Sequence, residues 1–103
     1  MTVIVTRAAA QDIDDAYDYV SEHDPAAADR QTDRFEALFA KLAEMPGIGS
    51  PRDEFQAGLR SRGVGRYVIN YKVIGDDLLI VRVVHGARNH AALFDTTDDA
   101  ANV

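Results

Sequence analysis

The sequence contains no cysteine, which excludes a disulfide framework and a zinc site with thiolate ligands. It also lacks long apolar runs. The N-terminal stretch MTVIVTRAAA is too short for the apolar core of a signal peptide, and no other stretch approaches the length of a membrane span. These absences favour a soluble protein, and we expect it in the cytoplasm.

Positive charge is scarce and unevenly placed. The 103 residues carry a formal net charge of −6, with ten acidic and four basic side chains in residues 1–50. Residues 51–94 reverse this balance with four acidic and seven basic side chains, although Lys72 is their only lysine. An acidic protein has no general attraction to nucleic-acid phosphates, so any positive surface must come from the second half of the chain.

Two helices are predicted in the first half of the chain. The first covers Ala8–Glu22, where apolar residues recur with helical spacing at Ile13, Ala16, Tyr17 and Val20. Asp24 followed by Pro25 is typical of a helix start, and the second helix is predicted from Pro25 to about Met45. Its apolar stripe consists of Phe35, Leu38, Phe39 and Leu42. So short a connection predicts an antiparallel helical hairpin.

The remaining segments have the composition and two-residue period of strands. They are Thr2–Thr6, Leu59–Val64, Tyr67–Val73 and Leu78–His85. The order β-α-α-β-β-β predicts an α+β fold, in which an antiparallel sheet carries the helical hairpin on one face. We expect a single domain over residues 1–94, followed by an acidic and flexible tail over residues 95–103.

The last predicted strand carries an arginine in its middle. Strict alternation places Leu78, Ile80, Arg82 and Val84 on one face and Leu79, Val81, Val83 and His85 on the other. We expect Arg82 to pair with a carboxylate or a carbonyl. The strand then runs into a segment with two histidines and a second arginine, residues 85–90, which has the residue types of either a catalytic centre or a basic contact edge.

The chain resembles the RelE/ParE toxin superfamily, and its ParE branch in particular. The matching stretches are Tyr19-Val20, Pro25–Ala28, Met45–Gly49, Gly58–Ser61, Gly65–Tyr71 and Val81–Arg88. Their order and spacing cover nearly the whole chain to Phe94. The resemblance implies a toxin of a type II toxin–antitoxin pair that is neutralised by a ParD-like antitoxin in a hetero-oligomer. ParE-like members are inhibitors of DNA gyrase, whereas RelE-like members are ribosome-dependent mRNA endonucleases.

The ParE-like interpretation requires no catalytic residue, cofactor, metal or direct nucleic-acid contact. We expect its target-binding edge to consist of the arginines of the sheet half, Arg60, Arg62, Arg66, Arg82 and Arg88. The alternative is a RelE-like endonuclease that uses His85, Arg88 and His90, and a third possibility is a non-toxic binding remnant of the family. Because the first half of the chain is acidic, we expect an amphipathic antitoxin segment with Lys or Arg where it crosses the helices.

Overall fold

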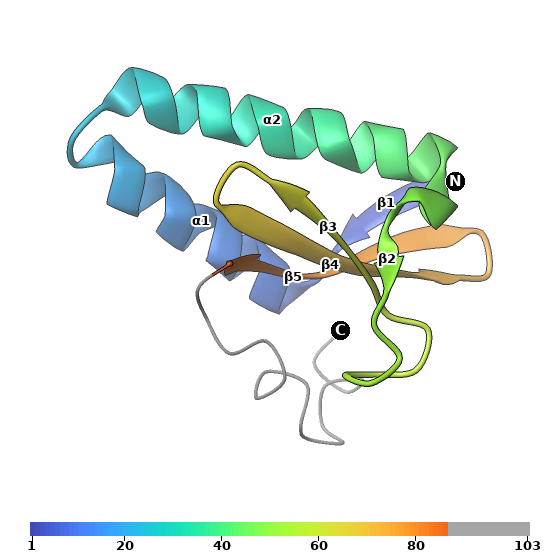
Figure 1. Ribbon diagram of the computed structural model, residues 1–103. Coiled ribbons are helices and arrows are strands. Elements are labelled where there is room, and N and C mark those ends of the chain that lie inside the picture. Colours follow the sequence, from blue (N-terminus) through green and yellow to red (C-terminus); the bar gives the residue numbers. More distant parts are fainter. Residues whose placement is uncertain (87–103) are drawn as a thin grey trace.

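The computed structural model describes residues 1–86 as one α+β layer structure (Figure 1). Its elements, in chain order, are β1 (Thr2–Val5), α1 (Arg7–Ser21), α2 (Pro25–Glu44), the 3₁₀ helix η1 (Pro46–Ile48), β2 (Ser50–Pro51), β3 (Arg60–Val64), β4 (Tyr67–Ile74) and β5 (Asp77–His85). The sheet has the strand order β1-β5-β4-β3-β2. The predicted α+β class and the order of helices and strands are confirmed, and the structure adds η1 and the two-residue strand β2. The predicted tail 95–103 lies outside the described residues.

Both helices begin at side-chain caps. The Ala9 N–H donates to Thr6 Oγ1 over 3.0 Å, and the Ala27 N–H donates to Asp24 Oδ1 over 3.1 Å. Each cap satisfies a backbone donor that the first turn of a helix leaves without a partner. Asp24 and Pro25 therefore start α2 where the sequence predicted.

The sheet is mixed rather than wholly antiparallel. Strands β3 to β5 form antiparallel neighbours, as predicted, and the added strand β2 pairs with β3 in the same sense. Strand β1, however, pairs with β5 in parallel, with Val3 opposite Leu78. The turn residues of an antiparallel hairpin allow the pairing of its two strands to be predicted from the sequence. A parallel pair joins segments that are far apart in the sequence, so no turn motif predicts its pairing. The antiparallel expectation is thus corrected for this one pair.

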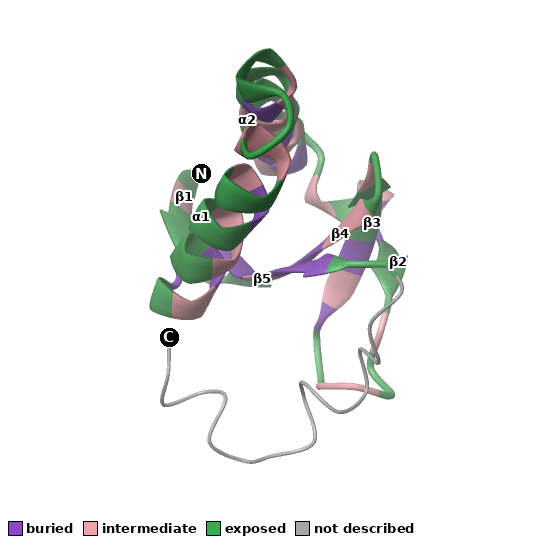
Figure 2. Cartoon of the chain, turned by 90° about the vertical axis from the view of Figure 1, so that its left-hand side faces the viewer, coloured by how far each residue is buried: buried purple, intermediate pink, exposed green. Residues whose placement is uncertain are grey.

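The main core lies between the helical hairpin and one face of the sheet (Figures 1 and 2). Of the predicted stripe on α2, Phe35, Phe39 and Leu42 are buried, while Leu38 is half-buried and packs against the same cluster. The sheet contributes Ile69, Tyr71, Leu78, Ile80 and Val83. A smaller cluster of Leu59, Leu79 and Val81 includes residues that alternate with core residues along β5.

A register shift between β4 and β5 changes which side chains of β5 face the helices. Asn70 lies opposite Arg82 but Tyr71 lies opposite Ile80, so Val81 is an extra residue in β5. Such a β-bulge reverses the alternation beyond it. Val83 therefore packs in the main core with Ile80, although strict alternation assigned the two to opposite faces. The predicted facing pattern of β5 is wrong from this point onward.

Candidate functional site

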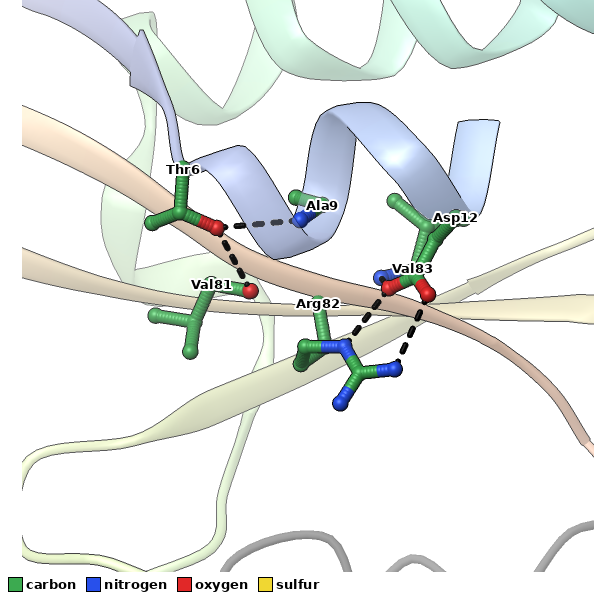
Figure 3. A network of polar contacts seen from close by, with 6 residues as sticks. All are labelled: Thr6, Ala9, Asp12, Val81, Arg82 and Val83. Atoms are coloured by element: carbon green, nitrogen blue, oxygen red, sulfur yellow. Dashed lines mark hydrogen bonds and ion pairs between the residues drawn. The ribbon is translucent and has the colours of Figure 1, made fainter. Parts of the chain in front are cut away.

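Arg82 is held against the first helix. Its Nε donates to Asp12 Oδ2 over 2.7 Å and its Nη2 donates to Asp12 Oδ1 over 2.9 Å (Figure 3). The two side chains are only 22% and 11% exposed. A fork-to-fork geometry of this kind fixes orientation as well as supplying energy. The predicted pairing of Arg82 with a carboxylate is confirmed.

The same carboxylate covers the edge of β5 beyond the short strand β1. The Val83 N–H donates to Asp12 Oδ2 over 2.9 Å, and the Thr6 hydroxyl donates to the Val81 carbonyl over 2.9 Å (Figure 3). Unpaired backbone groups at a sheet edge attract other strands unless they are covered. Thr6 and Asp12 thus replace a neighbouring strand at this edge, and Arg82 belongs to that arrangement.

Arg60 also binds backbone of its own chain. Its Nη1 donates to the Gly49 carbonyl over 2.7 Å and to the Gly47 carbonyl over 3.4 Å. Beside it, the Tyr71 hydroxyl donates to the Pro46 carbonyl over 2.7 Å and accepts from the Gly49 N–H over 2.8 Å. Arg60 and Tyr71 together fix the loop that leads from α2 to β2.

The other predicted arginines have different surroundings. Arg62 on β3 and Arg66 in the β3–β4 turn are exposed. Arg88 lies outside the described residues, as does His90 of the alternative nuclease set. The structure therefore divides the predicted edge into two arginines that hold the fold and two that face solvent, and it leaves the fifth undescribed.

A groove opens where the β3–β4 turn approaches the helical hairpin (yellow turn in Figure 1). Its volume is about 620 Å³, and its lining includes Tyr19 of α1, Arg30 and Arg34 of α2, Arg66 of the turn and His85 of β5. Among residues 1–86, no aspartate or glutamate contributes to this lining. The groove is thus a basic site on an acidic protein.

The floor of the groove is aromatic. The ring of Tyr67 meets Phe35 edge to face at 5.6 Å between centroids and meets His85 in the same manner at 5.4 Å. Burial raises the pKa of the Tyr67 phenol, and the nearby Tyr19 raises it further. Tyr67 is therefore a neutral, largely apolar surface at ordinary pH.

Glycines let the chain segments of the groove approach closely. Gly65 has a φ of +59°, and a Cβ at this position would lie 3.2 Å from Arg34 Nη1. The Gly86 N–H donates to the Arg66 carbonyl over 2.8 Å, which ties the turn to the end of β5. The turn therefore presents its backbone directly to α2.

The sequence analysis missed the contribution of α2 to this site. Arg30 and Arg34 are four residues apart and so lie on one side of the helix. That spacing could have drawn attention to them. Their proximity to Arg66 depends on how the turn packs against α2, which the linear pattern does not contain.

A second, shallower hollow lies between α1 and α2 and has the opposite charge. It has a volume of about 290 Å³ and is lined in part by Asp14, Asp29 and Asp33. The Tyr17 hydroxyl donates to Asp29 Oδ1 over 2.9 Å, and this hydrogen bond to a carboxylate raises the pKa of the phenol. Basic and acidic sites therefore flank α2.

No helix within residues 1–86 combines the length and apolar character that crossing a membrane requires.

Comparison with known proteins assigns the chain to a family. Residues 3–90 match the family described as the ParE toxin of the type II toxin–antitoxin system parDE. The chain therefore belongs to the ParE toxin family, as the resemblance implied.

Individual relatives agree with this assignment. Toxin ParE3 of Caulobacter vibrioides is 33% identical over 91 residues, which cover 87% of this chain and 91% of the relative. Toxin ParE1 of the same organism is 33% identical over 90 residues, covering 85% and 92% of the two chains. A solved structure of the chromosomal ParDE TA system from P. aeruginosa superposes with a TM-score of 0.70 at 25% identity, covering 82% of this chain and 95% of that one.

Proposed function

We propose that this ParE-family toxin acts in the cytoplasm by binding and inhibiting DNA gyrase, and that a ParD-like antitoxin neutralises it. The observation that carries the proposal is the family match over residues 3–90. The similarity to a chain of a ParDE system supports the antitoxin as partner. Inhibition by binding requires no catalytic group in the toxin.

In this proposal the exposed arginines of the sheet half contact the target. Arg62 and Arg66 present their guanidinium groups to solvent, and Arg88 remains a candidate from the sequence. Arg60 and Arg82 contribute indirectly, since their hydrogen bonds to Gly49 and Asp12 hold the surrounding backbone in place.

Parallel assays of plasmid supercoiling by gyrase and of mRNA integrity on ribosomes test this function. We expect the chain to inhibit supercoiling, to leave mRNA intact, and to lose its toxicity when the antitoxin is produced with it. Arg62→Gln should weaken gyrase inhibition about twofold to fivefold, because an exposed contact contributes up to ~1 kcal/mol. Arg7→Gln is the matched control, because Arg7 is an exposed arginine on α1.

The endonuclease alternative predicts a different pattern. Replacing an acid–base histidine typically lowers the rate about a hundredfold to ten-thousandfold. In our proposal His85→Gln keeps most of the toxicity. The proposal of gyrase inhibition would be rejected in favour of nuclease activity if the parent chain cleaved mRNA on ribosomes and a well-folded His85→Gln variant did not.

A further inference from the structure

Strand β1 is an outer strand of the sheet, and most of its residues are exposed (Figure 2). The segment Thr2–Val5 contains neither a charged residue nor a proline. Charged residues, proline and very short strands are features that keep sheet edges from pairing with other chains. The opposite edge has two of them, because β2 consists of two residues and one is Pro51. Beyond β1 the edge of β5 is covered by Thr6 and Asp12. Strand β1 is therefore the part of this edge that can still pair.

The backbone of β1 faces β5 at alternate residues. The Thr2 N–H donates to a carbonyl of the β4–β5 turn over 3.3 Å, and the Thr6 N–H donates to a carbonyl of β5 over 3.1 Å. In such a ladder the residues between the bonded ones turn their backbone groups to the other side. The N–H and C=O groups of Val3 and Val5 therefore point away from the sheet, where another strand can reach them.

The outward groups of β1 match those of a second copy of the same strand. If two β1 strands run antiparallel with Ile4 opposite Ile4, Val3 of each copy lies opposite Val5 of the other. Opposed residues of this kind exchange two hydrogen bonds, so the two pairs satisfy all the outward groups of Val3 and Val5. The two Ile4 residues then form a non-hydrogen-bonded pair with Cα atoms about 4.5 Å apart. Their side chains, each 39% exposed in the single chain, bury apolar surface against each other.

Opposite charges lie at the two ends of β1. Arg7 is exposed just after the strand, whereas Asp76 and Asp77 lie beside its start, with Asp77 opposite Thr2. In an antiparallel pair the start of one β1 lies beside the end of the other, so Arg7 of each copy approaches the aspartates of the other. A parallel pair would instead bring the two Arg7 side chains together. The charges therefore favour the same twofold arrangement as the backbone does.

We propose that two copies of this chain associate through their β1 strands, with the twofold axis at Ile4. The contact is isologous and closes after two copies, so it does not continue into a fibre. Stable interfaces bury about 1,200–2,000 Å², and a four-residue edge with a few flanking side chains offers less. The net charge of −6 on each copy also opposes association. The dimer is thus weak and depends on concentration, and it covers the open edge of the chain.

Sedimentation equilibrium of the complete chain tests the association. The weight-average mass should rise from that of one chain toward that of two between about 10 μM and about 1 mM, the range that populates a weak interface. Amide exchange followed by NMR over the same range locates the contact. The Val3 and Val5 amides should become protected only as the mass rises. The Thr6 amide donates within one chain and is the internal reference, protected throughout.

A charge exchange at the axis tests the register. Ile4→Lys and Ile4→Glu each place like charges opposite one another, so each variant alone should remain monomeric over the whole range. An equimolar mixture of the two places opposite charges there and should recover the dimer. Tyr19→Lys is the control, because it introduces the same charge at an exposed apolar side chain near the other end of α1 and should leave association unchanged. Thermal melting of every variant confirms that the fold is intact.

A second pair of variants tests the charges at the ends of the strand. Arg7→Gln removes its contact twice in the dimer and should weaken association about twofold to tenfold. Higher salt should weaken the parent dimer and have less effect on this variant. Arg62→Gln removes the same charge from β3, away from the edge, and should not weaken association.

A chain that stays monomeric up to about 1 mM would overturn the inference. So would dimerisation of Ile4→Lys alone, or a mixture of the two folded Ile4 variants that stays monomeric. If the Val3 and Val5 amides became protected only after the antitoxin was added, the edge would belong to the antitoxin instead of a second copy. Gyrase inhibition is assayed far below these concentrations, where the chain is a monomer. Arg7→Gln therefore remains a control in that assay, and neither result decides the other.

Discussion

The covered edge of β5 and the basic groove both contain arginines, but the surroundings of those arginines differ. At the edge, Arg82 is largely buried and shares the carboxylate of Asp12 with the backbone N–H of Val83. In the groove, Arg34 and Arg66 are exposed and lie above an aromatic floor. An arginine in this family fold can therefore either hold the layers together or present charge to a partner, and its contacts distinguish the two roles.

The largest effect on stability is expected from Asp12→Ala. The substitution leaves the Arg82 guanidinium and the Val83 N–H without their carboxylate partner. Breaking a buried ion pair costs about 3–5 kcal/mol, and the partial exposure of Arg82 reduces the expected loss to about 2–3 kcal/mol. Urea unfolding measures the free energy of unfolding.

Asp14→Ala is the matched control for this prediction. Asp14 lies on the same helix but is exposed, so its replacement should change the free energy of unfolding by less than ~0.5 kcal/mol. If Asp12→Ala is no more destabilising than Asp14→Ala, Asp12 does not hold the edge, and the contrast between the two arginine environments fails.

An intermediate effect is expected from Tyr71→Phe. Tyr71 is fully buried, and its hydroxyl joins the Pro46 carbonyl to the Gly49 N–H. The ring lies so close to Gly49 that a side chain at that position would collide with it. Loss of the hydroxyl leaves both backbone groups without this partner and should destabilise the protein by about 1–2 kcal/mol in thermal or urea unfolding.

The same substitution at the half-buried Tyr17 provides the comparison. Tyr17→Phe removes a hydrogen bond to Asp29 on the protein surface and should have little effect on unfolding. Similar losses in Tyr71→Phe and Tyr17→Phe would show that the loop after α2 does not depend on the buried hydroxyl.

The sequence predicted these inner contacts only in part. The start of α2 at Asp24 and Pro25 follows from their capping preferences. The pairing of Arg82 with some acceptor was predictable because burying an unpaired charge costs free energy. The identity of its partner, Asp12, depends on how α1 packs across β5. The bulge at Val81 could not be predicted from the sequence either, because the extra residue is apolar like the other residues of the strand.

The groove was less predictable than the fold. Sequence reasoning assigned positive charge to the sheet half, yet Arg30 and Arg34 come from a helix in the acidic half. On a helix, charged residues four apart are usual for a solvated face. Only the packing of the β3–β4 turn beside α2, with glycine at position 65, makes them neighbours of Arg66 and Tyr67.

The smallest effect is expected from Asp29→Asn, and it concerns titration rather than folding. The Tyr17 phenol donates to the Asp29 carboxylate, so deprotonation would place two negative charges side by side, and the pKa of Tyr17 is raised. The amide removes the charge, and the pKa of Tyr17 should fall toward its ordinary value. The pKa of Tyr67 is raised by burial in the groove and should not change. Ring resonances followed by NMR against pH report each tyrosine separately. If both pKa values fell together, the charge of Asp29 would act on both sides of α2. If the pKa of Tyr17 did not change, its raised value would be due to the remaining causes, burial and Asp18.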